Sequence, residues 1–259
     1  MERKNGFTLI ELLVVIAIIA LLLSIIIPSL NKARMVAQEI ICKSQIRQYG
    51  LATEMYTNDN DQMLPNAWRS LYAEDNFPGE LQRFCRWHNP EYNLERYPEY
   101  AGPYWPYLSA ADAHVCPLFA QLAPGFGSQH MEGNAGHHAS HCIGGPFEPQ
   151  FSYSMNAHIG EIRKDQVRSP SQTFLWAEEN MWTLIGLSTY VLNDNALLVG
   201  SETNPTDSIG SFHKISRNQL SIQQETREYN TGVANVLLVD GSVTWLTPED
   251  SIRYRGNVR

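Results

Sequence analysis

Positive charge is scarce in this 259-residue chain, which has 19 lysines and arginines against 27 aspartates and glutamates and a formal net charge of -8. Nucleic-acid binding needs a basic face, so this balance argues against a DNA or RNA partner. Cysteine is sparse too, with four residues and no CxxC pair. A zinc ribbon or thioredoxin-like motif is therefore not expected, whereas an even number in an exported chain permits two disulfides in three connectivities.

Charge is nearly absent from the N-terminal segment, where Glu11 is the only charged residue between positions 7 and 27. This run of about 21 residues measures roughly 31 Å as a helix, which matches the hydrocarbon core of a bilayer. An ordinary signal peptide has a shorter apolar region and a small-residue cleavage site, and a plain anchor leaves a costly carboxylate unexplained. Arg3 and Lys4 precede the run and predict a cytoplasmic N-terminus with the rest of the chain exported.

The stretch "GFTLIELLVVIAIIALL" resembles the N-terminal signal of type IV prepilins and type II secretion pseudopilins. In that family a prepilin peptidase cuts after the glycine, which is Gly6 here, and the new N-terminal residue, Phe7, is N-methylated. The resemblance implies that Glu11 pairs with the positively charged N-terminal amine of a neighbouring subunit. Such a pair would leave neither charge alone when the apolar helices bundle.

A helical pattern continues beyond the apolar run to about Thr57. Pro28 lacks a backbone donor, so it predicts an interruption of the helix, a feature that pilin-like helices often share, or the point of membrane exit. Apolar residues then recur near helical spacing until "NDND" at 58–61 stops the helix. The predicted division is a leader at 1–6, a transmembrane and assembly helix at 7–28, an amphipathic helix at 29–61 and a globular extracytoplasmic head at 62–259.

The head is rich in short β-forming runs separated by loops. "FSYSMNAHIG" and "QTFLWAEEN" are typical of strands, and "STYVLN" and "ALLVG" predict two more. "NVLLVDGSVTWL" places β-formers on both sides of Asp240-Gly241, which favours a type I′ hairpin. With the N-terminal helix, these runs predict an α+β fold in which a pilin-like long helix packs on an antiparallel sheet.

Further stretches resemble one branch of the prepilin-like proteins that is abundant in planctomycete and lentisphaera-type bacteria. They are "CKSQIRQYGLATEMYTNDNDQMLP", "YWPYL" with "HVCP", "FSYSMN" and "SPSQTFLWAEE". Members of that branch often carry a histidine, nine residues and then Asp-Gly near the C-terminus. Here His213 precedes Asp240-Gly241 with residues 214–239 between them, so this chain departs from the pattern by an insertion.

The same resemblance favours one pairing of the cysteines. Cys42 and Cys116 lie in stretches that match the branch and are the preferred pair, and Cys85 with Cys142 then follows by exclusion. Each bond would stabilise a loop-rich head by roughly 2 to 4 kcal/mol.

Two clusters have the composition of metal sites. One lies in a glycine-containing loop, and its residues are His130, His137, His138, His141 and Cys142. The other is "NDND" at 58–61, which offers hard oxygen ligands but lacks the glycine and final glutamate of a calcium-binding EF loop. We expect no metal and no cofactor, with zinc at the first cluster and calcium at the second as alternatives.

Catalysis is not expected in the head. His213 and Asp240 would need a serine nucleophile, but the sequence has no G-x-S-x-G elbow. Asp240 is also explained as a turn residue. We therefore predict that the chain is not an enzyme.

The prediction is a prepilin-like structural subunit of a type IV pilus or a type II secretion pseudopilus-like filament. It would sit in the inner membrane as a single-pass protein with a periplasmic head, and also in a surface or periplasmic filament. Its expected partners are the prepilin peptidase, other pilin-like subunits and membrane lipid. The alternative is a membrane-anchored binding protein, for example for glycans, that uses the signal only for export and presents exposed tryptophan and tyrosine.

Overall fold

The computed structural model describes part of the chain. Its described residues are 8–73, 94–123, 149–182, 184–185, 187, 192, 194–200, 206–226, 228 and 232–256. Contacts between Cα atoms divide the chain into two compact units, Met1–Ile40 and Ile41–Arg259, and each is considered by itself.

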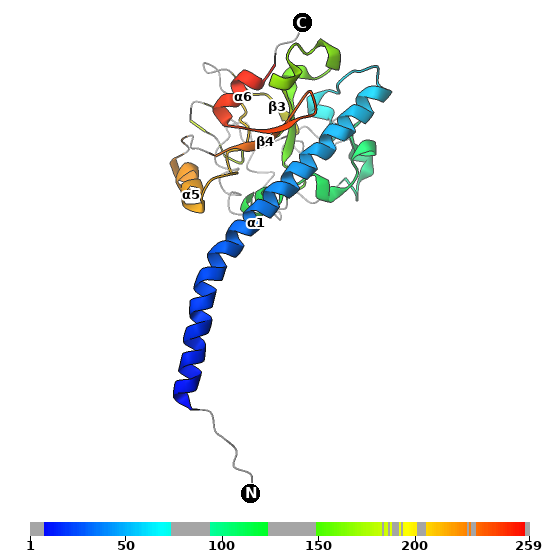
Figure 1. Cartoon of the computed structure of the whole chain (residues 1–259). Coiled ribbons are helices and arrows are strands. Elements are labelled where there is room, and N and C mark those ends of the chain that lie inside the picture. Colours follow the sequence, from blue (N-terminus) through cyan, green and yellow to red (C-terminus); the bar gives the residue numbers. More distant parts are fainter. Residues whose placement is uncertain are drawn as a thin grey trace, which may run out of the picture. The chain divides into compact units, whose positions relative to one another are not determined.

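Helix α1 (Leu9–Asp59) contains the whole apolar run and continues through Pro28 (Figure 1). The helix therefore continues where an interruption was expected. Pro28 removes one backbone hydrogen bond, and the hydrogen bonds of the turns before and after it keep the chain helical. Within the first unit the apolar side chains from Leu9 to Ile27 are exposed. Burial along α1 begins at Cys42, the second residue of the second unit.

The C-terminal end of α1 is closed by its own chain. The backbone N–H of Gln62 donates to the carbonyl of Thr57 over 2.8 Å, and Asp61 and Gln62 both have positive φ. Asn60 also returns a side-chain hydrogen bond to the carbonyl of Tyr56. This left-handed termination satisfies carbonyls that a helix end leaves open, so the predicted stop at 58–61 is where α1 ends.

Five strands of the described residues form one sheet with the order β3-β1-β2-β4-β5. Neighbouring pairs are antiparallel except β1 with β3, which is parallel. The predicted α+β fold, with a long helix packed on a sheet, is confirmed. The sheet is antiparallel as expected except at one edge, where a long connection after β2 allows β3 to enter in the same direction as β1. The strands are β1 (Tyr153–Asn156), β2 (Phe174–Glu178), β3 (Ala196–Leu197), β4 (Ala234–Leu238) and β5 (Val243–Leu246).

Both faces of the sheet are covered, which explains why β1, β2 and β4 are buried throughout. On one face, Trp176 and Leu237 pack in the same core as Tyr49 of α1. Gly50 lets the helix backbone approach, since a Cβ there would lie 3.2 Å from Leu237. On the other face, Ala177 and neighbours form a second core with residues of α6 (Pro248–Tyr254).

The predicted β4–β5 hairpin is present, but its turn differs from the expected type. Gly241 donates its N–H to the carbonyl of Leu238, and Leu238 donates to the carbonyl of Ser242. Gly241 has φ +85°, whereas Asp240 is not among the residues with positive φ. A type I′ turn needs positive φ at both positions, so the Asp-Gly signal instead produced a three-residue loop with glycine at its left-handed position.

The insertion between His213 and the hairpin begins and ends at neighbouring points of the fold. His213 and Val233 exchange backbone hydrogen bonds of 3.0 and 3.1 Å, which closes the base of the segment between them. Helix α5 (Arg217–Thr226) lies in this insertion (Figure 1). The insertion therefore leaves His213 placed against the start of β4. Helix α2 (Pro117–Leu122) follows Cys116 directly.

Candidate functional site

The first candidate site is the start of α1. Thr8 donates its backbone N–H and its hydroxyl to Oε2 of Glu11 over 2.8 and 2.7 Å, and Glu11 N–H donates to the Thr8 hydroxyl. This reciprocal pattern is a capping box, in which the two residues satisfy donors that a helix start leaves open. Within one chain, Glu11 is thus a helix cap, and its carboxylate is exposed to any neighbour.

The apolar side chains behind this cap are exposed among the described residues of the chain. α1 is long and apolar enough to cross a bilayer, judged by length and composition. Leu9, Leu13 and Ile25 are 79%, 56% and 67% exposed. An exposed apolar surface of this size needs to be covered by lipid or by other apolar helices.

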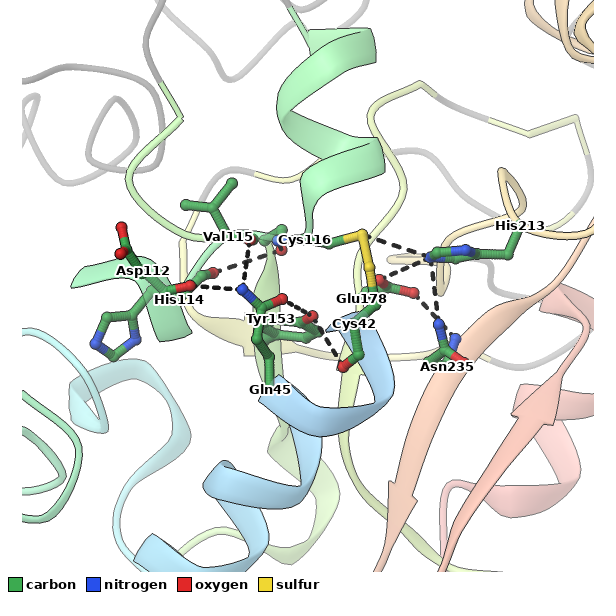
Figure 2. The surroundings of a disulfide bond; sticks show 11 residues. Cys42, Gln45, Asp112, His114, Val115, Cys116, Tyr153, Glu178, His213 and Asn235 are labelled. Carbon is green, nitrogen blue, oxygen red and sulfur yellow. Dashed lines mark hydrogen bonds and ion pairs between the residues drawn. A yellow bond between two sulfur atoms is a disulfide. The ribbon is translucent and has the colours of Figure 1, made fainter. Parts of the chain in front are cut away.

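The second candidate site lies in the head, where a disulfide joins Cys42 of α1 to Cys116 before α2 (Figure 2). This is the pair that the resemblance favoured. The Cys116 N–H donates to the Ser152 hydroxyl, and the Tyr153 hydroxyl donates to the carbonyl of Cys42. The disulfide and its hydrogen bonds therefore hold together three segments: helix α1, the 104–116 loop and the start of β1.

Strand alternation places polar side chains beside this disulfide. In β4, Ala234, Val236 and Leu238 face the α6 core, so Asn235 faces the opposite side with Leu237. In β2 the same alternation brings Glu178 to the α1 side after Ala177. A carboxylate is thus directed into a dry core, where it needs strong partners.

Glu178 finds those partners in His213 and in β4. Its Oε1 lies 2.9 Å from His213 Nε2, and its Oε2 accepts the backbone N–H of Asn235 over 3.0 Å. His213 Nε2 also lies 3.6 Å from Cys116 Sγ and 3.3 Å from Asn235 Nδ2. Glu178, Cys42 and Cys116 are 0% exposed and His213 is 3% exposed, so solvent plays no part in this cluster.

A second polar chain runs from the disulfide along α1. Gln45 donates through Nε2 to the carbonyl of Val115 over 3.0 Å and accepts the Tyr153 hydroxyl through Oε1 (Figure 2). One turn further on, the Tyr49 hydroxyl lies 2.7 Å from Nδ1 of His114. Because His114 Nε2 faces the carbonyl of Leu108 at 3.0 Å, that nitrogen carries the proton and Nδ1 accepts from Tyr49. These bonds hold α1 to the loop that carries Cys116.

The comparisons with known proteins agree with the N-terminal site. Residues 1–27 match the family described as Prokaryotic N-terminal methylation motif. The chain is also 42% identical over 66 residues to a Type IV wide pilus major component, PilA4, of Thermus thermophilus. The N-terminal part of the chain is prepilin-like. The PilA4 match covers 26% of this chain and 50% of the relative, so the chain spans about half the length of the curated relative it matches. No solved structure matches.

Several of the predicted site residues are not in the described part of the structure. Gly6, Phe7, Cys85 and Cys142 lie outside the described residues, as does the histidine-rich loop at 130–142. The predicted strand at 188–193 also falls almost entirely outside them.

The two halves of the C-terminal motif are not brought together. His213 bridges Val233 at the start of β4, whereas Asp240 and Gly241 follow its end. Asp240 is exposed and accepts hydrogen bonds from the N–H and hydroxyl of Ser242, over 2.9 and 2.6 Å. Asp240 is therefore a turn residue, and the partner of His213 is Glu178, which the sequence analysis missed. The signal for it was a glutamate among β-formers in "FLWAEE".

The acidic stretch at 58–61 makes hydrogen bonds to the head through a side chain and through the backbone. Asp59 accepts the Tyr107 hydroxyl over 2.9 Å, and the Asp61 carbonyl accepts Arg163 Nη1 over 3.1 Å. These contacts join the end of α1 to two head loops.

The neutral His114 gives the head an acid-sensitive contact. Burial lowers the pKa of His114 to about 4, opposed by its bond to the Leu108 carbonyl. The unfolded chain takes up this proton below about pH 6.5, but the folded chain does so only near pH 4. The contribution of the neutral His114 to the stability of the fold is complete above pH 6.5 and is lost as the pH falls to 4.

We expect this proton to lower the free energy of unfolding by about 3 kcal/mol between pH 7 and pH 4. Burial raises the pKa of Asp207 to about 7, so Asp207 acts with the opposite sign in much of this range. The measurement is therefore the difference between the wild type and His114→Gln in urea unfolding of the full chain in detergent. A difference that stays constant from pH 7 to pH 4 would contradict the burial of a neutral imidazole.

Proposed function

We propose that this chain is a prepilin-like structural subunit of a type IV pilus or a type II secretion pseudopilus-like filament. A prepilin peptidase would cut it after Gly6, and Phe7 would then be N-methylated. The observation that carries the proposal is the exposed apolar part of the N-terminal helix at 9–27, which lies in a methylation motif and has Glu11 as its one carboxylate.

The uncovered helix supports a subunit that moves between two apolar surroundings. Lipid can cover α1 while the chain is in the inner membrane, and the helices of neighbouring subunits can cover it in a filament. The Thr8–Glu11 capping box serves the first state, because it satisfies the helix start within one chain.

Glu11 has a second use in the assembled state. Cleavage after Gly6 would create an ammonium group on Phe7, four residues before Glu11 in sequence. The same amine on a neighbouring chain would pair with the exposed carboxylate of Glu11 and neutralise both charges inside the bundle. Assembly is thus coupled to processing, since no ammonium exists at Phe7 before the cut.

The head would lie on the periplasmic side and take part in contacts between subunits. The described disulfide fits an oxidising compartment. In this proposal the chain is a substrate of the peptidase and not an enzyme, and the four-part division at 1–6, 7–28, 29–61 and 62–259 assigns processing, anchoring, spine and head. The proposed assembly needs no cofactor and no nucleic acid.

The rival is an anchored binding protein, and exposed aromatic residues would favour it. Trp68 and Trp245 are 38% and 43% exposed, whereas Trp176 and Trp182 are buried in the core. The two proposals differ in where the protein is found.

Fractionation of the native cells distinguishes them. Filaments are released by shearing or by opening the periplasm, separated from membrane vesicles on a density gradient and probed with an antibody against the head. We expect the processed chain in the filament fraction, and a pool of processed chain that has not yet assembled in the membrane fraction. Exclusive recovery with membranes, under conditions where other pilin-like subunits enter filaments, would favour the anchored binding protein.

A further inference from the structure

The proposed assembly role does not explain why a buried glutamate and a buried histidine lie beside the disulfide in the head. Cys42, Cys116, Glu178 and His213 each offer one possible ligand atom, and these four atoms lie within 4.8 Å of one another. We propose that the dithiol form of this chain binds one Zn²⁺ ion through the two Sγ atoms, His213 Nε2 and Glu178 Oε1.

The four ligand atoms lie close enough together to reach tetrahedral zinc geometry once the disulfide is reduced and the two sulfur atoms separate. Zn–S bonds of about 2.3 Å and Zn–N or Zn–O bonds of about 2.0 to 2.2 Å place tetrahedral ligands ~3.3 to 3.8 Å apart. Cys116 Sγ and His213 Nε2 are already 3.6 Å apart. His213 Nε2 and Glu178 Oε1, now 2.9 Å apart in a hydrogen bond, need to separate by several tenths of an ångström.

The surroundings of His213 Nε2 suit a metal better than a set of hydrogen bonds. A neutral imidazole nitrogen has either one N–H or one lone pair. Nε2 nevertheless has a carboxylate oxygen, a sulfur and the Nδ2 of Asn235 within 3.6 Å. Among the described residues, Asn235 Oδ1 is buried without a hydrogen-bond partner. One cation at the centre would use Nε2, the carboxylate and both sulfurs at once.

The second set of contacts holds the ligands in place. The Asn235 N–H binds Glu178 Oε2 and leaves Oε1 directed at the centre. The Cys116 N–H is held by Ser152, and the Cys42 carbonyl is held by Tyr153. Partners of this kind orient ligands and raise metal affinity.

Charge and ligand type favour zinc over other divalent ions. Two thiolates and one carboxylate beside Zn²⁺ leave one net negative charge, which faces the Asn235 N–H. Thiolate and imidazole ligands in tetrahedral geometry select zinc, whereas calcium and magnesium prefer oxygen alone. The site is closed, with four protein ligands and almost no exposure, as in structural zinc sites.

The zinc form and the disulfide form exclude each other. Each thiol loses one proton when its sulfur binds Zn²⁺, and neither sulfur remains a thiolate once the disulfide has formed. The chain is made with thiols, so the dithiol form precedes the disulfide. His213 and Glu178 take no part in the disulfide bond, so substitutions of these two residues distinguish a metal site from a plain disulfide.

Cobalt(II) provides a direct probe because its spectrum reports thiolate and tetrahedral ligation. The full chain is purified in detergent with Cys85→Ser and Cys142→Ser, reduced with a phosphine without oxygen and titrated with Co²⁺. We expect one Co²⁺ per chain, a thiolate-to-cobalt charge-transfer band and displacement by Zn²⁺. The oxidised chain is expected to show none of these.

Ligand variants test the four-residue assignment. We expect His213→Ala and Glu178→Gln each to weaken Co²⁺ binding at least about tenfold. The matched control is His158→Ala, which removes a partly buried histidine outside the cluster, one that contacts the Val199 carbonyl. If His213→Ala and Glu178→Gln bind Co²⁺ as tightly as the control, the proposed site is wrong.

Folding is measured beside each titration by circular dichroism. If the reduced chain is folded and shows no charge-transfer band, the proposal is overturned. If it is unfolded without metal, Zn²⁺ must restore the folded spectrum, because a ligand that binds only the folded state stabilises it. Failure of Zn²⁺ to do so also overturns the proposal. If the two serine substitutions prevent folding, the wild type is compared with Cys42→Ser/Cys116→Ser, which is expected to lose one equivalent of Co²⁺.

Discussion

Replacing Glu11 with alanine is expected to remove the chain from filaments while leaving it in the membrane. The apolar run is unchanged, so insertion should proceed as in the wild type. The N-terminal amine of a neighbouring subunit would have no carboxylate and would stay unpaired inside the bundle, at a cost of several kcal/mol. Gradient fractionation should therefore show at least a tenfold loss from the filament fraction with equal membrane content.

Glu11→Gln separates this charge pair from the helix cap. Glutamine can replace glutamate in a capping box, so the bonds with Thr8 are kept while the charge is lost. Pairing with an amine predicts that Glu11→Gln fails to assemble, as Glu11→Ala does. Normal incorporation of Glu11→Gln would reduce Glu11 to a helix cap and refute its role between subunits.

Loss of the Cys42–Cys116 bond is expected to have the largest effect on the stability of the head. The two residues are 74 positions apart, and closing a loop of that length removes about 4 kcal/mol of chain entropy from the unfolded state. Cys42→Ala/Cys116→Ala should therefore lower Tm by roughly 10 °C in a head of this size.

The reduced chain provides the matched comparison for this variant. With Cys85→Ser and Cys142→Ser in both proteins, a chelator present and a phosphine added, the chain that retains Cys42 and Cys116 should melt near the alanine variant. The alanine variant itself should be indifferent to the phosphine. An alanine variant that melts at the oxidised wild-type temperature would show that this bond contributes little to folding.

Local patterns predicted the elements of the fold better than their long-range placement. The helix ends near "NDND" because Asp61 and Gln62 adopt left-handed conformations, and the β1 and β2 runs were recognised from their β-formers. The parallel entry of β3 was missed, because a two-residue strand has no periodicity and its direction depends on the connection before it.

The head cluster shows why a site is harder to predict than an element. His213 was noticed because it precedes Asp240-Gly241 in the sequence, as in the C-terminal motif. The structure explains Asp240 by its hydrogen bonds in the turn, without His213. Glu178 reaches His213 only because β2 and β4 are neighbours and their alternation faces α1. The sequence analysis did not group Cys42, Cys116, Glu178 and His213 because they lie in four separate segments, whereas its candidate metal clusters were contiguous in sequence.

The N-terminus of the chain purified from its own membranes is the most direct test of the prepilin-like account. Intact mass and the mass of the N-terminal peptide should show loss of residues 1–6 and one added methyl group on Phe7. That result would show that the ammonium needed to pair with Glu11 is made in the cell. An intact Met1, or a cut beyond Ile27, would contradict the account and leave an anchored or secreted head with a different task.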